Sequence, residues 1–201
     1  MQTEKLKYRK YLPDDDMSLV ARYIHLTDPY IYPAVCDVDD PFFTKVIRKC
    51  ADDRTNIYYR DNLFLALYEE KIIGVLVAVK CGRELVFADN LELSCDEHKK
   101  LIQANEGYFI PLIKESRELD GYNITNLCID ADYRKMGVGE GLLRFYLSQS
   151  NGESVYLDVL ADNPGAIRLY ERCGFEILQE YYGFSGTSSP VRCYHMKRNG
   201  T

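Results

Sequence analysis

The segment 124–140 constrains the fold more than any other part of the chain, because its pattern changes from strand to glycine loop to helix within a few residues. Ile124, Leu127 and Ile129 predict a half-buried strand, and the apolar residues at helical spacing from Val138 onward predict one buried face of a helix. The first turn of such a helix has backbone amides without partners inside the helix, which suits an anion. The segment therefore predicts an α/β fold with a loop that could hold phosphate.

The loop itself contains Gly137 and Gly139, preceded by Arg134 and Lys135. Glycine permits positive φ, so the amides can form a concave nest, and the two cations add charge at its rim. A Gly-x-Gly pair is expected roughly once by chance in a chain of this length, so an ordinary strand-to-helix turn stays open at this point. Gly141 lies inside the helix, where glycine costs about 1 kcal/mol relative to alanine, and we expect it to pack closely against another element.

A second strand and helix are predicted at 154–175, with clear boundary signals. Asp162 or Asn163 can cap the helix, Pro164 suits its first position, and Gly174 suits the position just past its end. Because a helix joins the two strands, we expect them to be parallel neighbours with a right-handed crossover.

Two motifs therefore follow one another in the C-terminal half, Arg134-x-x-Gly137-x-Gly139 and Asn163-x-x-Ala166-x-x-x-Tyr170-x-x-x-Gly174-Phe175. Together they resemble the paired signature of the Gcn5-related N-acetyltransferase (GNAT) superfamily, which binds acetyl coenzyme A. The resemblance runs from about Asn123 to the end, and Ala131 departs from it where many members have proline.

The resemblance implies one α/β (α+β) domain over residues 1–201, with a mixed, mostly antiparallel sheet of about seven strands. A parallel, splayed pair lies at the centre of such a sheet, and helices flank it. Residues 1–120 would shape the acceptor site and residues 121–201 would bind acetyl-CoA. In this family the strand before the loop offers backbone groups to the pantetheine arm, and the loop amides hold the pyrophosphate. The implied cofactor-binding residues are Leu127, Cys128, Ile129, Arg134, Lys135, Met136, Gly137, Val138, Gly139, Glu140, Asn163, Ala166 and Tyr170.

Two residues are candidates for catalysis. Tyr170 resembles the tyrosine that acts as general acid in many members, and a phenol of pKa about 10 is protonated at neutral pH; the alternative is a core tyrosine. Asp158 lies five residues before Asn163 and resembles the position of the catalytic glutamate in the ribosomal-protein alanine acetyltransferases. Strand alternation places Asp158 in largely apolar company, which suits a base, although a structural carboxylate is equally compatible. A strand amide near Ile129 is the candidate to polarise the thioester carbonyl.

The predicted function is acetyl transfer from acetyl-CoA to a primary amine by direct attack on the thioester. An alkyl amine of pKa about 10.4 is neutral in only roughly one part in 10³ at pH 7, a penalty of about 4 to 5 kcal/mol, so a base or a water chain is needed. The acceptor stays open between a protein N-terminus, a lysine and a small cationic amine such as a polyamine or an aminoglycoside. The alternative is a catalytically silent acyl-CoA-binding module. Either a monomer or a homodimer is compatible with the resemblance.

Composition excludes several other classes. The chain has 201 residues, of which 46% are hydrophobic and 28% charged, as in a globular domain. A net charge of −6 argues against nucleic-acid binding, which needs a basic face. No apolar run reaches the roughly 20 residues of a membrane span, and the start of the chain lacks the apolar core of a signal peptide, so the expected location is cytoplasmic. The acidic clusters at 14–16, 37–40 and 52–53 fit helix caps better than an acceptor site.

The cysteines and histidines show no metal-binding spacing, and we expect no metal. Seven cysteines without a Cys-x-x-Cys pair indicate reduced thiols, and Cys128 and Cys173 are interpreted as small buried hydrophobes. His25, His98 and His195 are scattered, and none is assigned a catalytic role.

The remaining elements are predicted from periodicity and turn signals. Strands are expected at 6–12, 63–68, 71–80, 176–182 and 192–197, and helices at 17–26, at 41–52 and from about 96. The tyrosine-containing segment 28–33 is interpreted as a loop that could line an acceptor pocket or could be a packed surface turn.

Overall fold

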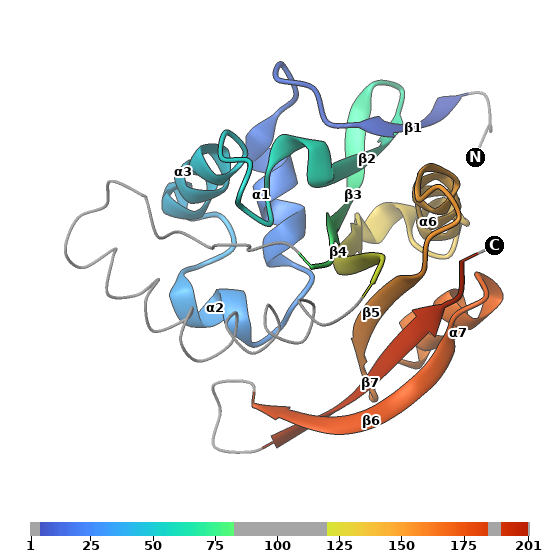
Figure 1. Cartoon of the computed structure of the whole chain (residues 1–201). Helices are drawn as coiled ribbons and strands as arrows, with labels where there is room; N and C mark the ends of the chain where they lie inside the picture. Colours follow the sequence, from blue (N-terminus) through green and yellow to red (C-terminus); the bar gives the residue numbers. More distant parts are fainter. Residues whose placement is uncertain (1–4, 83–119, 185–189, 201) are drawn as a thin grey trace.

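The computed structural model describes residues 5–82, 120–184 and 190–200, and its centre is a seven-stranded sheet in the order β1-β2-β3-β4-β5-β7-β6 (Figure 1). The strands are β1 Leu6–Lys10, β2 Leu63–Tyr68, β3 Lys71–Lys80, β4 Tyr122–Ile129, β5 Val155–Leu160, β6 Glu176–Phe184 and β7 Pro190–Arg198. The β4–β5 pair is parallel, and the other neighbouring pairs are antiparallel. The predicted mixed, mostly antiparallel sheet with a central parallel pair is thereby confirmed.

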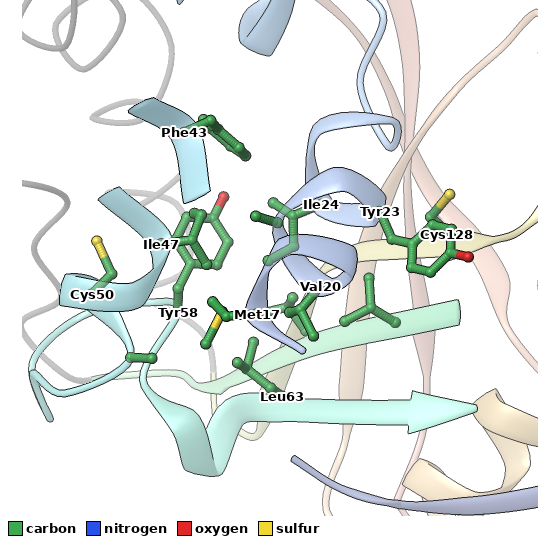
Figure 2. Packing of buried hydrophobic residues seen from close by; sticks show 14 of the residues in the cluster. Met17, Val20, Tyr23, Ile24, Phe43, Ile47, Cys50, Tyr58, Leu63 and Cys128 are labelled. Atoms are coloured by element: carbon green, nitrogen blue, oxygen red, sulfur yellow. The ribbon is translucent and has the colours of Figure 1, made fainter. Parts of the chain in front are cut away.

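Helices cover both faces of the sheet (Figure 1). They are α1 Met17–His25, α2 Ile31–Val35, α3 Pro41–Cys50, α6 Val138–Gln149 and α7 Pro164–Arg172, with short 3-10 turns η2 Arg60–Asn62 and η4 Ala131–Tyr133. Alternation along the strands divides the core in two, as β2 illustrates: Leu63 and Leu65 pack with α1 and α3, whereas Phe64 and Ala66 pack with α6. Figure 2 shows the first of these clusters, where Met17, Ile24 and Ile47 meet Tyr58 and Leu63.

Local sequence explains where several elements begin and turn. Asp16 caps α1 and Asp40 caps α3 through their side chains, which confirms helix capping as the role of two residues in the acidic clusters. The β2–β3 hairpin turns at Glu69 and Glu70, which have φ of 49° and 65°, as a two-residue turn between twisted strands requires.

Most predicted elements lie within two residues of their predicted bounds, and the differences have local causes. Strand β1 ends at Lys10 rather than at residue 12, shortly before a turn at residues 13–14, and α3 ends at Cys50 rather than at residue 52, because a turn begins at Ala51. The segment 28–33 is not simply a loop, since the short helix α2 begins at Ile31 and buries Tyr32. The helix predicted from residue 96 lies outside the described residues. Within the described ranges, no helix is long and apolar enough to cross a membrane.

Candidate functional site

The parallel strands β4 and β5 are paired only at their N-terminal ends. Pairing covers Tyr122 with Val155, Asn123 with Tyr156 and Ile124 with Leu157. Strand β4 continues to Ile129 and β5 to Leu160 without further mutual pairing, so the two strands separate in their C-terminal halves (Figure 1). The predicted splay of the central pair is thus present, and it leaves backbone groups of β4 without a strand partner on that side.

The direction of the β4 backbone identifies these groups. The amide of Asp130 donates to the carbonyl of Ile73 in β3 at 2.9 Å. Because N–H and C=O groups alternate in direction along a strand, the amides of Leu127 and Ile129 point away from β3, toward the separation from β5. These are two of the residues that the sequence assigned to the pantetheine arm.

A bulge at Thr125 determines which side chains accompany those amides. The β3 register passes from Asn126 to Ile124 and leaves Thr125 without a partner residue. Ile124, Leu127 and Ile129 therefore share the α6 face in spite of the three-residue step between the first two. Asn126, on the other face, turns toward α1 and α2.

The predicted phosphate loop connects β4 to α6 through the single turn η4. Gly137 is the N-terminal cap of α6 and has φ of 80°, and Lys135 also has a positive φ of 60°. Within the described chain no side chain caps this helix, and the first backbone bond of the helix runs from the amide of Gly141 to the carbonyl of Gly137 at 2.9 Å. The amides of Val138, Gly139 and Glu140 therefore lie ahead of that first bond, at the positive end of the helix dipole.

Close packing fixes the position of this helix end. A Cβ atom on Gly141 would overlap the ring and hydroxyl of Tyr8 on β1, which confirms the expectation of a tight contact at Gly141. A Cβ on Gly139 would meet the Ile129 side chain at 3.4 Å and the Leu169 side chain at 3.6 Å, so α6 also lies against the end of β4 and against α7.

The side chains of the loop point in different directions. Arg134 donates from Nε to the carbonyl of Ile129 at 2.9 Å, which ties the loop back to the strand. Glu140 bonds to Arg144 and to Arg172, with its carboxylate oxygens 3.0 and 3.1 Å from the guanidinium nitrogens. Hydrogen bonds from these two arginines lower the pKa of Glu140. Met136 is 53% exposed. Arg134 and Glu140 thus have protein partners, whereas Lys135 is exposed.

Helix α7 supplies the second motif. Asn163 caps it by accepting a bond from the amide of Ala166 at 3.1 Å, so Asn163 rather than Asp162 is the cap. Tyr170 is only 8% exposed and packs against Phe175, with ring centroids 5.9 Å apart. Its hydroxyl makes no hydrogen bond with the described part of the chain. Burial raises the pKa of Tyr170 to about 12, so its hydroxyl is protonated and able to donate at neutral pH.

Asp158 lies on the opposite face of the sheet from Tyr170. Val155, Leu157 and Val159 of β5 belong to the same cluster as Tyr170, so Asp158 points to the other side. Its carboxylate oxygen lies 2.9 Å from Nδ1 of His195, which is opposite it in the β5–β7 register. The surroundings of Asp158 are therefore not the apolar ones expected, because the imidazole of His195 lies beside its carboxylate.

Three side-chain hydrogen bonds connect the segment from α1 to α2 with β4 and the residue after it, and the sequence had indicated none of them. Tyr23 donates to Asp130 at 2.8 Å, and burial together with this contact raises the pKa of Tyr23. Asn126 donates to Thr27 at 2.7 Å and to the hydroxyl of Tyr32 at 3.0 Å, and that hydroxyl lies 2.5 Å from the hydroxyl of Tyr58. The only local signal was the odd three-residue apolar step that marks the bulge beside Asn126.

Two cysteines contribute to packing, as the sequence predicted. Cys128 and Cys173 are buried in the two core clusters, and burial raises the pKa of each. Among the residues with described positions, no group of three or more metal-ligating side chains occurs.

Comparisons with known proteins agree on one family. Residues 32–175 match the family model described as Acetyltransferase (GNAT) family. The chain is 35% identical over 81 residues to N-alpha-acetyltransferase RimI of Mycobacterium tuberculosis, covering 39% of this chain and 49% of that protein. It is 36% identical over 70 residues to the ribosomal protein bS18-alanine N-acetyltransferase of Escherichia coli K12, covering 32% of this chain and 47% of that protein. The chain thus spans about half the length of these curated relatives.

A solved structure supports the fold along almost the whole chain. The N-acetyltransferase from Staphylococcus aureus Mu50 superimposes with a TM-score of 0.65 at 15% sequence identity, and the match covers 95% of this chain and 99% of that one.

Proposed function

The chain belongs to the acetyltransferase (GNAT) family, and we propose that it transfers an acetyl group from acetyl-CoA to the α-amine of a peptide or protein N-terminus. The observation that carries the proposal is the separation of β4 from β5, with a glycine-capped helix end beside it and Tyr170 and Asp158 on opposite faces of the sheet. A site of this form can receive the two substrates from different sides.

The residues present fit acetyl-CoA. The amides of Val138, Gly139 and Glu140 suit the pyrophosphate, because an anion at a helix N-terminus is stabilised by unpartnered N–H groups and by the helix dipole. The amide of Leu127 suits a carbonyl group of the pantetheine arm, which would run along the unpaired half of β4, and the amide of Ile129 stays available for the thioester. Bound there, acetyl-CoA supplies an activated acyl group as a thioester.

The chain's own residues account for the proton movements. The amide of Ile129 donates to the thioester carbonyl oxygen as negative charge develops on it. The amine nitrogen forms a bond to the carbonyl carbon, the carbon–sulfur bond breaks, and the amine proton passes to the carboxylate of Asp158. Tyr170 donates its proton to the departing sulfur from the opposite face, and its raised pKa keeps that proton available.

The chemistry of the base favours an α-amine over a lysine. An α-amine of pKa about 8 is neutral in roughly one molecule in ten at pH 7, which costs about 1 kcal/mol, whereas a lysine costs about 4 to 5 kcal/mol. A carboxylate hydrogen-bonded to an imidazole is a weak base. Such a base can deprotonate an α-amine more readily than a lysine, because the free-energy cost of deprotonation is smaller. The names of the two curated relatives, both acting on α-amines, support the same choice.

The experiment compares four acceptors at equal concentration with acetyl-CoA, following released thiol and the mass of the product. The acceptors are a peptide with a free N-terminus and no lysine, an N-terminally blocked peptide with one lysine, a polyamine and an aminoglycoside. The proposal predicts that the first peptide is acetylated at least tenfold faster than the others, as the smaller deprotonation cost implies. Faster acetylation of the lysine or of a small amine would show that the proposed α-amine acceptor is wrong. Stabilisation of the protein by coenzyme A without turnover of any amine would instead favour a silent binding module.

A further inference from the structure

Asp158 has a directly opposed partner on the neighbouring strand. Residues 158 and 195 face each other in the β5–β7 register, and Oδ1 of Asp158 lies 2.9 Å from Nδ1 of His195. Both side chains are partly buried, with 20% of Asp158 and 16% of His195 exposed. A pair held by strand register and shielded from water is more rigid than an exposed ion pair.

The chemistry of the two groups determines the direction of the bond. An ionised carboxylate only accepts hydrogen bonds, so Nδ1 carries the proton and donates it. The ring of Tyr156 stacks on the imidazole with centroids 5.7 Å apart and an interplanar angle of 12°, which restrains the plane of the ring. Both contacts help to orient His195, and His195 in turn restricts the rotation of the Asp158 carboxylate.

The order of the strands places the pair relative to the separation between β4 and β5. Strand β5 borders that separation, and β7 lies on the far side of β5. Asp158 is thus the nearer of the two to the place where the thioester is proposed to lie, and His195 stands behind it. Resting on the proposed function, we propose that His195 is a positioning residue that aims the Asp158 carboxylate at the acceptor amine and makes this step sensitive to pH.

The sign of the pH effect follows from charge. With neutral His195 the pair has a net charge of −1, which attracts an ammonium group and leaves the carboxylate able to accept its proton. When His195 takes up a second proton, the pair becomes neutral overall, and its attraction for an ammonium group decreases. An imidazole ordinarily protonates near pH 6.5. Turnover is therefore expected to fall as pH decreases through this range.

Among the described residues, the same register identifies the other titratable groups on this face. On β5 the described group is Tyr156. On β7 they are Cys193 and Lys197, two residues away from His195 on either side, and the Lys197 ammonium lies 5.5 Å from the centre of the Tyr156 ring. On β6, Gln179 is opposite His195, while Tyr181 and Glu176 are opposite Cys193 and Lys197. Lys197 provides a matched control, because it shares the strand and the face but is opposite Tyr156 and forms no hydrogen bond or ion pair with Asp158 within the described chain.

The kinetic test uses His195→Gln, His195→Ala, Asp158→Asn, the double variant Asp158→Asn with His195→Ala, and Lys197→Gln. Each is assayed from pH 5.5 to 9 with a free-N-terminus peptide, first with the peptide varied at saturating acetyl-CoA and then with acetyl-CoA varied at a fixed peptide concentration. His195→Ala is expected to lower kcat/KM for the peptide about tenfold at pH 8 and to leave the KM for acetyl-CoA within twofold, but to cost nothing further in the Asp158→Asn background. His195→Gln keeps a hydrogen-bond donor but cannot titrate. Its kcat/KM for the peptide is expected to stay within about threefold of wild type at pH 8 and not to fall as pH decreases. Lys197→Gln should behave as wild type.

The proposal would be overturned if His195→Ala lowered kcat/KM equally in the wild-type and Asp158→Asn backgrounds. It would also be overturned if kcat/KM of His195→Gln fell at low pH as it does in the wild type. A measurement that does not depend on activity separates a failure of the proposed His195 role from a failure of the proposed function. By ¹⁵N NMR, neutral His195 is expected to carry its proton on Nδ1 in the wild type and to shift toward the Nε2 tautomer in Asp158→Asn. If no amine is acetylated but this shift is seen, the pair is established and the proposed function is wrong. If the tautomer does not change, the pairing itself is wrong.

Discussion

The loop between β4 and α6 is built mainly from backbone groups, whereas the segment from α1 to α2 is held to the same strand by side chains distant in sequence. In the loop, Gly137 at positive φ and the first helical turn present amides, and no side chain in the described chain caps the helix. On the other face, Asn126 reaches Thr27 and Tyr32, and Tyr23 reaches Asp130. A backbone site leaves a local sequence motif, and a side-chain network does not. The following experiments, ordered by the size of the expected effect, test this contrast.

The largest effect is expected for Tyr170→Phe. Its hydroxyl has no hydrogen bond to lose within the described chain, so the free energy of unfolding should change little, while kcat should fall about 10²-fold if the hydroxyl protonates the leaving sulfur. Kinetics at saturating substrates and thermal unfolding measure the two quantities. Tyr146→Phe is the matched control, because the Tyr146 hydroxyl is also buried and without a partner among the described residues but lies on α6. A loss of kcat that is the same for both variants would remove Tyr170 from catalysis.

Asn126→Ala is expected to act on the other face. Removing the amide leaves the hydroxyls of Thr27 and Tyr32 without this donor, which should lower the free energy of unfolding by about 1 to 3 kcal/mol. The KM for the peptide should rise and the affinity for acetyl-CoA should stay constant, because the loop amides are untouched. Asn123→Ala on the same strand is the control, since its Oδ1 makes no hydrogen bond among the described residues. Equal increases in both KM values would contradict the separation of the two regions.

Gly141→Ala tests the packing of the loop helix. The added methyl overlaps Tyr8, and such overpacking typically costs about 1 to 3 kcal/mol. Displacement of α6 should also weaken coenzyme A binding, measured by calorimetry. Tyr8→Leu in the same chain is expected to restore part of the loss. Gly165→Ala, whose methyl would meet only the side-chain oxygen of Asn163 at 3.7 Å, should be close to neutral. No rescue by Tyr8→Leu would mean that another contact positions the helix.

A smaller effect is expected at the start of α7. Asn163→Ala removes the cap of this helix and should cost about 1 kcal/mol in the free energy of unfolding. Asp162→Ala, next to it, should cost less because Asp162 is not the cap. Denaturant unfolding of the two variants decides between them, and a larger cost at Asp162 would reverse the assignment.

The smallest expected effect is an absence of change at high pH. Because burial raises the pKa of Tyr170 to about 12, the hydroxyl keeps its proton as pH increases from 7 to 10, and kcat should not decline over that range through loss of this acid. The pH dependence of kcat measures this directly. If kcat declined below pH 10 in the wild type but not in Tyr170→Phe, the hydroxyl would ionise at a lower pH than this account predicts.

The sequence allowed most elements and the loop to be predicted because both depend on short-range rules. The hairpin at 63–80, the cap at Asn163 and the glycine at the start of α6 follow from periodicity, from side-chain capping and from positive φ. The close contact at Gly141 was also predictable, although its partner Tyr8 was not, since β1 lies far away in the chain.

What could not be predicted depends on strand register and on bulges. The Asp158–His195 contact requires that β7 pair with β5 at one particular register, and a shift by one residue would place His195 on the other face. Asn126 faces α1 and α2 only because of the bulge at Thr125, which reverses the alternation for the rest of β4. Neither feature leaves a motif, so polar residues on these strands could be recognised as partners only in the folded sheet.

The most direct test of the central claim is hydrogen–deuterium exchange of the chain with and without acetyl-CoA. If the donor lies along the unpaired half of β4 and against the first turn of α6, peptides covering residues 126–141 should exchange more slowly with acetyl-CoA. Peptides covering α1 and α3 should be unchanged. Protection confined to α1 and α3, or no protection at 126–141 at a saturating concentration of acetyl-CoA, would contradict the account.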